Sequence, residues 1–482
     1  MQKLIFALFS MSTLVMAQGS LPWSKAVSIS LLASRPGNVM FYVSSYSWSG
    51  THSDYDMARQ AADAYVSAHP GSPTYLVLNP TINQTCDDVP LPAFVSGSAR
   101  SSSVSIIGYG SNISSILKRS GCAARAATFG NSELPGSPVM NAWFQGFTVN
   151  ANHIDRAACE MYGMSGATFV DISCGNAAPG ADHEVELGNQ DATSAGLMYN
   201  INLYNLKTFD FVGVGKGAVL IPTWNGGKIT GVAVSNPGTK KYSQQYTRAQ
   251  IVGPDSSTCS VMPTITPIVS NAGSATFANL PVVNYGLITG VTITNAGSCS
   301  STSRLYVLIQ DGLPVTFGMK FSNLTYSHAW NLEATGSTTY GEGWMAASAY
   351  NTVLGEHPYT NQTVQIAEYA LGDKHIGAFF DSPGLYGATI YGQSGTFIDS
   401  IFAWDGASYI AGSGYYLGSS KYSTWTVLNS QCTNSTPNFI SITTAQGVVA
   451  GSGSAPNGIG LKDIENCNGT QAVDWETQVV EQ

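Results

Sequence analysis

The chain has 482 residues, of which 10% are charged, 44% hydrophobic and 11% aromatic, and it contains 51 glycines. This composition excludes a disordered protein and argues against a helical bundle, because sparse charge with abundant glycine suits stacked strands and polar turns. The formal net charge of -9, without a cluster of lysines or arginines, argues against nucleic acid and anionic membranes as partners.

The first segment predicted from the sequence is a secretory signal peptide at residues 1–17. Lys3 gives it a positive start, an apolar stretch follows, and small residues precede Gln18. No other stretch reaches the ~18 apolar residues that a membrane-spanning helix needs. We therefore predict a secreted, extracellular protein without a transmembrane helix.

Residues 18–80 are predicted to contain short strands and one helix. The helix is DYDMARQAADAYVSAH, residues 54–69, and Ser53 or Asp54 can cap its amino end. Pro70-Gly71 ends the helix, and the strand TYLVLNP follows directly.

Most of the remaining chain consists of strand-sized runs separated by Gly, Ser, Asn or Asp. Three such runs lie in NAWFQGFTVNANHIDRAACEMYGMSGATFVDISCGN, residues 141–176. Similar strand-sized runs return after residue 317. A barrel, a sandwich or a parallel coil can protect the edges of so many strands. We interpret residues 81–214 and 313–446 as two parts of one right-handed parallel β-helix in an all-β protein. Residues 447–482 are interpreted as a cap or tail.

Residues 215–312 differ from the flanking segments in sequence pattern and are predicted to be an inserted small β domain. KITGVAVSNPG at residues 228–238 and LITGVTITNAG at residues 287–297 share ITGV without change, 59 residues apart. Such self-similarity marks a duplicated unit. Its predicted role is structural or carbohydrate-binding.

Eight cysteines are consistent with export to an oxidising compartment. They allow 105 connectivities, and the simplest joins neighbours in the sequence. The candidate disulfides are Cys86–Cys122, Cys159–Cys174, Cys259–Cys299 and Cys432–Cys467.

The helix opened by aspartates, its Pro/Gly break and the strand TYLVLNP resemble the start of the pectate-lyase-like β-helix superfamily. Polysaccharide lyases, glycoside hydrolases and phage tailspikes share that start, in which the helix covers the open end of the coil. The inserted domain is similar to small β modules of phage tail fibres and tailspikes. The sequence departs from the polygalacturonase type, because it lacks the Asn-Thr-Asp, Asp-Asp and Gly-His-Gly set.

The resemblance implies a secreted protein that cleaves an extracellular polysaccharide, by hydrolysis or elimination, on the coil surface. The alternative is a non-catalytic glycan-binding adhesin or tailspike-like receptor-binding protein. A calcium ion is implied if the chain is a lyase, and a homotrimer if it is tailspike-like. No coiled-coil heptads signal trimerisation.

Two aspartates in a repeated local pattern are the first catalytic candidates. Asp381 lies in AFFDS and Asp399 in TFIDS, 18 residues apart, each two residues after a phenylalanine. Equivalent positions on adjacent coils lie ~4.8 Å apart. We therefore predict that both carboxylates face solvent as an acid–base pair, with Phe379 and Phe397 beside them to stack on sugar rings. The alternative is a turn-capping aspartate beside a buried phenylalanine.

Further candidates are single acids and tryptophans beside acids. Glu368 and Asp373 are additional catalytic candidates, with ordinary surface acids as the alternative. Glu342-Gly343-Trp344 and Trp404-Asp405 each pair a ring with an acid, which suits a sugar subsite. The predicted substrate-binding residues are Phe379, Phe397, Trp344, Trp404, Asp405 and Lys374.

Two charged clusters remain. His183 lies among acids that include Asp182, and His375 follows Lys374. Lys374 or Arg156 can neutralise a uronate and let a lyase abstract a proton. No cysteine or histidine spacing typical of zinc occurs, so no metal ligands are predicted.

Overall fold

The computed structural model describes residues 28–462 apart from internal gaps. The gaps are residues 51, 87–103, 126, 131–138, 179, 190–196, 210–214, 216, 253–254, 256–257, 276–282, 304, 312–314, 336, 338, 359–363, 382–385, 391–394, 404–412, 418–423, 429–430, 434–439 and 443–457. The predicted signal peptide, most of the predicted tail, Trp404, Asp405 and Cys467 lie outside the described residues.

The largest sheet of the coil has 14 strands, and all its pairings are parallel. In spatial order its strands are β1 (Val39–Tyr42), β2 (Thr74–Val77), β4 (Val104–Ile107), β8 (Trp143–Asn150), β11 (Thr168–Gly175), β14 (Asn202–Phe209), β28 (His328–Trp330), β30 (Thr352–Leu354), β32 (Lys374–Ile376), β35 (Gly395–Ile398), β38 (Thr424–Leu428) and β41 (Gly458–Lys462), with β3 (Ile82–Thr85) and β5 (Ser115–Lys118) beside them.

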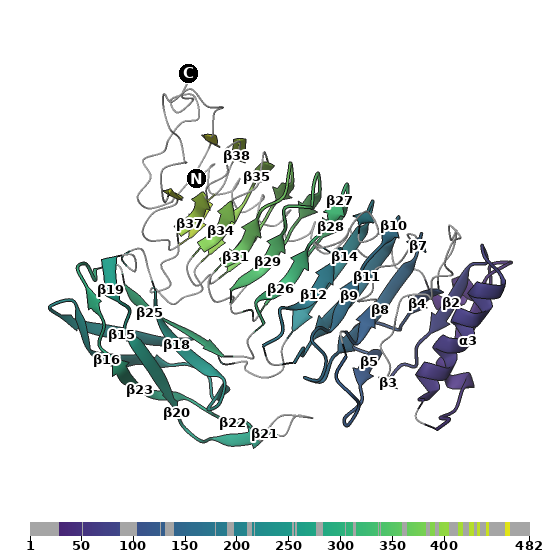
Figure 1. Cartoon of the computed structure of the whole chain (residues 1–482), viewed down its shortest axis with the longest axis horizontal. Coiled ribbons are helices and arrows are strands. Elements are labelled where there is room, and N and C mark those ends of the chain that lie inside the picture. The colour runs from purple at the N-terminus through teal and green to yellow at the C-terminus, as the bar shows by residue number, and fades with distance from the viewer. Residues whose placement is uncertain are drawn as a thin grey trace, which may run out of the picture.

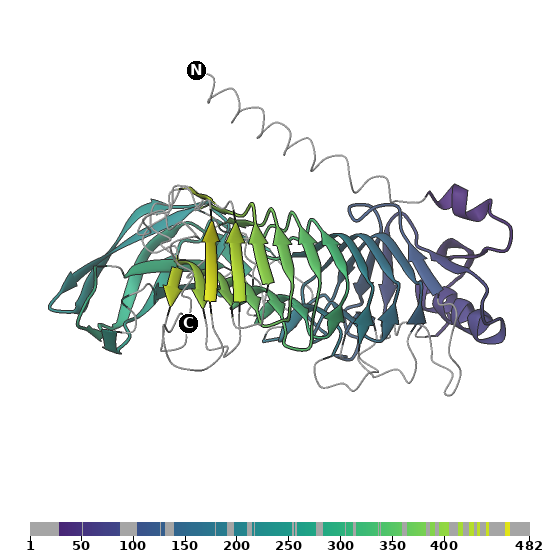
Figure 2. The ribbon, with the colours of Figure 1, turned by 90° about the horizontal axis from the view of Figure 1, so that it is seen from above.

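The second sheet of the coil has nine strands, also parallel. Its strands are β6 (Phe129–Gly130), β9 (Cys159–Met161), β12 (His183–Leu187), β26 (Phe317–Phe321), β29 (Tyr340–Trp344), β31 (Val364–Glu368), β34 (Tyr386–Ile390), β37 (Ser413–Leu417) and β40 (Ile440–Ile442). In Figures 1 and 2 these strands lie across the long axis like rungs, one per coil.

Two short parallel sheets complete the circuit. One contains β7 (Val139–Met140), β10 (Met164–Ser165), β13 (Met198–Tyr199) and β27 (Leu324–Thr325), and the other contains β33 (Phe379–Asp381), β36 (Ile401–Ala403) and β39 (Gln431–Thr433). Because the described strands of the coil pair in parallel with the strand one coil away, the chain is a right-handed parallel β-helix, as predicted.

One helix closes the first end of the coil. In α3 (Asp54–Ala68) the Ser53 hydroxyl accepts from the Asp56 N–H, and the Asp56 carboxylate accepts from the Ser53 N–H. This reciprocal cap satisfies two amide groups at the start of the helix. The helix buries Tyr55 and Ala62 and packs on β1, β2 and β3, at the purple end of the coil in Figure 1. The predicted capping helix is therefore confirmed.

Two short helical segments precede it, α2 (Ile29–Ala33) and η2 (Val43–Ser45). None of the helices in the described ranges is long and apolar enough to cross a membrane.

The coil has one continuous core in which rings stack from coil to coil. Phe144 lies on Phe169 with centroids 5.0 Å apart, and Phe321 lies on Trp344 at 3.9 Å. A corner of left-handed residues runs along the largest sheet, inside its longer strands or directly after its shorter ones. These residues are Gly146, Asp171, Asn205, Asn331, Gly355, Gly377 and Asp399.

The inserted domain is antiparallel and has its own core. Its strands are β15 (Ala218–Asn225), β16 (Lys228–Pro237), β17 (Tyr242–Ser243), β18 (Thr247–Val252), β19 (Cys259–Val261), β20 (Thr264–Val269), β21 (Gly273–Ala275), β22 (Val283–Gly286), β23 (Ile288–Asn295), β24 (Ser298–Cys299) and β25 (Tyr306–Asp311). The two ITGV repeats end in the same turn, since Gly238 N–H donates to Asn236 and Gly297 N–H to Asn295, both at 2.9 Å. Figure 1 shows this domain beside the stack of coils.

Three predicted disulfides are present: Cys86–Cys122, Cys159–Cys174 and Cys259–Cys299. The fourth pair, Cys432–Cys467, stays a prediction because Cys467 lies outside the described residues.

Candidate functional site: a charged network on the coil surface

Three neighbouring strands of the nine-stranded sheet place a charged side chain at the same register position. Glu160 of β9 pairs in register with Glu186 of β12, which pairs with Lys320 of β26. The residues on either side of each charge are apolar and belong to the core of the coil. Since side chains alternate along a strand, these three charges point away from the core.

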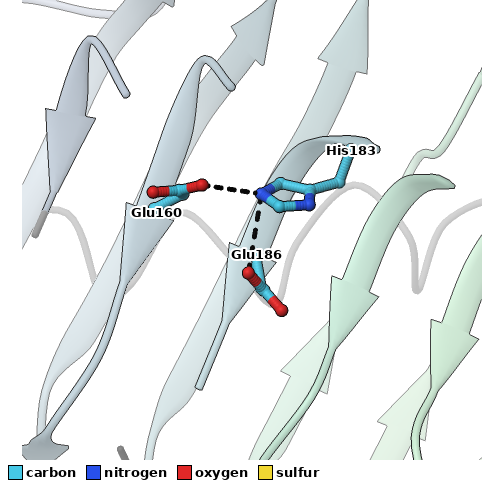
Figure 3. Close-up of side chains that lie close together, drawn as sticks. All are labelled: Glu160, His183 and Glu186. Atoms are coloured by element: carbon cyan, nitrogen blue, oxygen red, sulfur yellow. Dashed lines mark hydrogen bonds and ion pairs between the residues drawn. The ribbon is translucent and has the colours of Figure 1, made fainter. Parts of the chain in front are cut away.

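His183 lies between the two glutamates, as Figure 3 shows. Its Nε2 atom is 3.0 Å from Glu160 Oε1 and 3.6 Å from Glu186 Oε2. Its Nδ1 atom is 3.2 Å from Asp182 Oδ2. Both ring nitrogens therefore face carboxylates.

Two further cations neutralise these carboxylates. Arg156 donates from Nε to Glu160 Oε1 at 3.0 Å and from a terminal nitrogen to Oε2 at 3.2 Å. Lys320 Nζ lies 2.8 Å from Asp182 Oδ2 and 3.5 Å from Glu186 Oε1. We call these six residues, with Tyr162, the charged network.

Tyr162 completes the buried side of the network. Its hydroxyl donates to Glu186 Oε2 at 2.8 Å, and the Ser322 hydroxyl donates to the other oxygen of Glu186. Tyr162 and Glu160 are buried, whereas the side chains of Arg156 and Asp182 are 59% and 50% exposed. A ligand approaching the coil therefore meets Arg156 and Asp182 first.

The network sets the protonation of its members. Burial alone would lower the pKa of His183, but hydrogen bonds to Asp182 and Glu160 and the nearby negative charges raise it to about 9. The His183 hydrogen bond and Lys320 hold the pKa of Asp182 below its usual range. Burial and the Glu186 charge raise the pKa of Tyr162. At neutral pH His183 is an imidazolium and Tyr162 a neutral phenol, so both are proton donors.

Glu160, His183 and Glu186 offer three ligand atoms within 4.8 Å of one another. Calcium prefers oxygen ligands, and an imidazolium has no lone pair for any metal. Both oxygens of Glu160 already accept from Arg156. The residues present therefore fit an ion-pair network and do not fit the calcium ion implied by a lyase.

The predicted catalytic candidates Glu368 and Asp373 do not lie on the surface. Glu368 pairs in register with Trp344 and points into the core, and Asp373 is buried at a corner beside Asn351. Glu342 and His375 also point inward, since they pair with core residues. A substrate on the outside of the coil cannot reach any of these side chains.

These residues form an interior cluster with Glu356. His375 Nδ1 lies 2.8 Å from Glu356 Oε1, and its Nε2 lies 3.0 Å from Glu368 Oε2. Burial raises the pKa of Glu342 well above its usual range, and the Glu356 charge adds to this. Burial would lower the pKa of His375, but the Glu356 charge and both hydrogen bonds raise it well above its usual range.

The predicted pairing of Asp381 with Asp399 is wrong. Asp381 ends β33 and pairs with Ala403, whereas Gly377 aligns with Asp399. Asp399 is exposed, as predicted, but it has a φ of 53° at a corner. Phe379 pairs with Ile401, 22 residues further on, so AFFDS and TFIDS, which are 18 residues apart, occupy different parts of a coil. The left-handed backbone at Asp399 also interrupts the two-residue alternation, so Phe397 is buried while Asp399 is exposed. The side chain of Asp381 lies outside the described residues.

Some of the residues predicted to bind sugar are buried and others are exposed. Phe397 and Trp344 are fully buried in the core, which corrects their assignment to an outer subsite. Phe379 is half-buried against His357, with ring centroids 5.0 Å apart, and Lys374 is exposed.

The sequence-based search missed Glu160, Tyr162 and Lys320. A signal for them exists in the sequence, because an apolar–charged–apolar triplet recurs in three strands. The triplets are Cys159-Glu160-Met161, Val185-Glu186-Leu187 and Met319-Lys320-Phe321. Such triplets mark one outward charge between two core residues, but only the pairing register places them side by side.

No family model matches the chain, and no curated protein matches it. Among solved structures, the N-terminal fragment of bacteriophage Phi29 gene product 12 is 10% identical with a TM-score of 0.41, over 88% of this chain and 66% of that one. The A-module of the Azotobacter vinelandii mannuronan C-5 epimerase AlgE4 is 10% identical with a TM-score of 0.35, over 90% and 99%. Pectate lyase Pel9A is 8% identical with a TM-score of 0.35, over 90% and 76%.

Proposed function

We propose that the protein is secreted and that it binds and cleaves an acidic extracellular polysaccharide at the charged network. The observation that carries this proposal is an exposed arginine in front of two protonated donors. Arg156 is 59% exposed at the rim, while His183 and Tyr162 lie behind it. The three disulfides support an extracellular location, since such bonds persist in oxidising compartments.

The chemistry follows from these roles. The Arg156 guanidinium keeps donors beyond the two that bind Glu160, and a planar guanidinium recognises a sugar carboxylate well. His183 or Tyr162 then gives a proton to the glycosidic oxygen as its bond to the sugar breaks. In hydrolysis a water adds its hydroxyl to the freed sugar carbon and its other proton restores the donor; in elimination the sugar instead loses the proton beside its carboxylate to the deprotonated donor, and a double bond forms. Glu160 and Glu186 are positioning residues, because they act by holding His183 and Tyr162.

The test uses the full-length protein on polygalacturonate, alginate and a neutral cellulose derivative. Reducing ends report hydrolysis or elimination, and absorbance of an unsaturated sugar reports elimination alone. We expect products from an acidic polymer, and a loss of about 10²-fold or more in His183→Asn, the usual contribution of general acid catalysis. Arg156→Gln should mainly raise KM.

The matched control is an ion pair elsewhere on the coil. Lys207→Gln breaks the pair between Lys207 and Glu333 on the largest sheet and should leave activity unchanged. Full activity of both His183→Asn and Arg156→Gln would overturn the assignment of the site.

A second candidate function is non-catalytic glycan binding, as in an adhesin or a tailspike-like receptor-binding protein. It is favoured by the closed pairing of the network, in which Asp182, Glu160 and Glu186 each already contact a cation. Binding of an acidic polymer without any products would support this function instead.

A further inference from the structure

Three tyrosine rings form an exposed row on the coil, away from the charged network. Tyr199, Tyr326 and Tyr350 are 45%, 53% and 49% exposed. The ring centroids of Tyr199 and Tyr326 are 5.7 Å apart, and those of Tyr326 and Tyr350 are 5.3 Å apart and stacked. We call these three residues the tyrosine row.

The row follows the axis of the coil. Tyr199 of β13 pairs in register with Thr325 of β27, and Thr325 forms a bridge with Ala349 of the next coil. Tyr326 and Tyr350 directly follow these two residues. The short sheet that carries the row lies along one edge of the coil, where β7, β10 and β27 are labelled in Figure 1. Each of three successive coils thus contributes one ring.

Two of these tyrosines occupy backbone positions that disfavour them. Tyr326 has a φ of 49° and Tyr350 a φ of 57°. The equivalent corner residues of other coils are Asn141, Gly166, Asn200 and Gly372, also with positive φ. A left-handed conformation costs a bulky residue roughly 1 kcal/mol or more, whereas glycine and asparagine adopt it readily. The rings at Tyr326 and Tyr350 therefore do not serve the stability of the corner.

The size and surroundings of the row favour a glycan over a protein partner. Three half-exposed rings offer roughly 300 Å² of surface, against about 800 Å² per partner in a stable protein interface. The row is one ring wide. Polar side chains border it at the next outward positions along the chain, which are His328, Thr352 and Lys374. A linear sugar chain has apolar C–H faces for the rings and polar groups for this border. The Lys374 ammonium suits the carboxylate of a uronate.

We propose that the tyrosine row is a binding platform for a linear, uronate-containing polysaccharide that runs along the coil axis. The apolar C–H groups of successive sugars pack on the exposed parts of the three rings, and the polar side chains beside the row contact hydroxyl and carboxylate groups. This proposal rests on the proposed function, because it names a second contact for the same class of polymer.

The test replaces Tyr326 and Tyr350 together by asparagine, the residue found at Asn200 in the same corner. We expect the melting temperature of this double variant to stay unchanged or rise, because asparagine relieves the left-handed strain. Its affinity for polygalacturonate or alginate, measured by calorimetry with the full-length chain, should fall about tenfold or more. Tyr326→Phe should keep the affinity, since the apolar contact with the sugar needs the ring and not the hydroxyl.

The matched control is Tyr109→Asn, which removes a tyrosine of similar exposure (47%) outside the row and should leave binding unchanged. Equal affinity of the double variant and the wild type would overturn the binding role of the tyrosine row, while the proposed function would stand. No binding of either polymer by the wild type would overturn both. Dissociation of an oligomer in the double variant, seen by sedimentation, would make the row a subunit contact and overturn the platform.

Discussion

The Nε2 atom of His375 lies 3.0 Å from Oε2 of Glu368 inside the coil, and solvent reaches neither side chain. Glu356 binds the opposite ring nitrogen at 2.8 Å. Buried ion pairs stabilise little beyond their desolvation cost, but removing one partner leaves an uncompensated charge in the core. Burial and the Glu356 charge raise the pKa of Glu342 well above its usual range, which favours its uncharged form, and Glu342 and Glu356 each have one buried oxygen without a hydrogen-bond partner.

The first prediction concerns His375. Replacing it with glutamine leaves Glu356 and Glu368 without their shared cation, so we expect a loss of about 3–5 kcal/mol in the free energy of unfolding. Urea unfolding measures this loss. The neighbouring Lys374→Gln is the control, because Lys374 is exposed and its replacement should change stability by less than about 0.5 kcal/mol. Equal unfolding midpoints for His375→Gln and wild type would contradict the prediction.

The second prediction is a fall of stability with rising pH. The fold raises the pKa values of Glu342, Glu368, Asp373 and His375. The stabilising contribution of each is complete below its unfolded pKa, about 4 for the carboxyl groups and about 6.5 for histidine, and is lost as pH rises through the folded value. We expect the melting temperature to fall as the pH rises above these unfolded values.

Glu342→Gln tests the origin of this pH effect. Glutamine keeps the shape of the side chain but does not titrate, so the fall in melting temperature should become smaller. A melting temperature that rises over the same range would rule out the raised pKa values.

The coil and the inserted domain could be predicted because their signals are local. Strand-sized runs between polar turns indicate stacked strands, and the repeated ITGV marks a duplication. The candidate site could not be predicted in the same way, since it depends on which residues of adjacent coils align. Phe379 pairs with Ile401, 22 residues further on, so the 18-residue spacing of Asp381 and Asp399 does not place them on equivalent positions. The inward direction of Glu342 and His375 contradicts the usual exposure of charged residues.

The third prediction concerns the disulfide Cys159–Cys174. Both cysteines lie in the core of the coil, and the bond closes a loop of 15 residues. By loop-closure entropy, its removal in a Cys159→Ala/Cys174→Ala variant should cost roughly 3 kcal/mol. The matched control removes Cys259–Cys299, which lies in the separate core of the inserted domain. Calorimetry should then show the main coil transition shifted by the first change only.

The fourth prediction is that the coil folds without residues 215–311. The chain before this domain and the chain after it both bind the connection between β11 and β12. Asn176 N–H donates to Phe209 O, and Thr316 N–H donates to Ala181 O. A short linker can therefore replace the domain, whose core is separate. We expect the deletion variant to be secreted and to melt cooperatively. Loss of secretion together with loss of cooperative melting would show that the coil needs the insert.

The last prediction concerns the pKa of His183. Asp182 and Glu160 raise it to about 9, so the stabilising contribution of His183 is complete below about pH 6.5 and is lost as pH rises through about 9. Asp182→Asn removes one of these anions, and we expect the pKa to fall toward its ordinary value. An NMR titration of the histidine ring carbons measures it, with His328, which is exposed on the largest sheet, as the internal control.

The same variant separates a functional role from a structural one. If His183 donates a proton during cleavage, the alkaline limb of the pH–activity profile should move to lower pH in Asp182→Asn together with the NMR value. A profile that stays in place while the NMR pKa moves would assign proton donation to Tyr162, whose neutral form persists across this range.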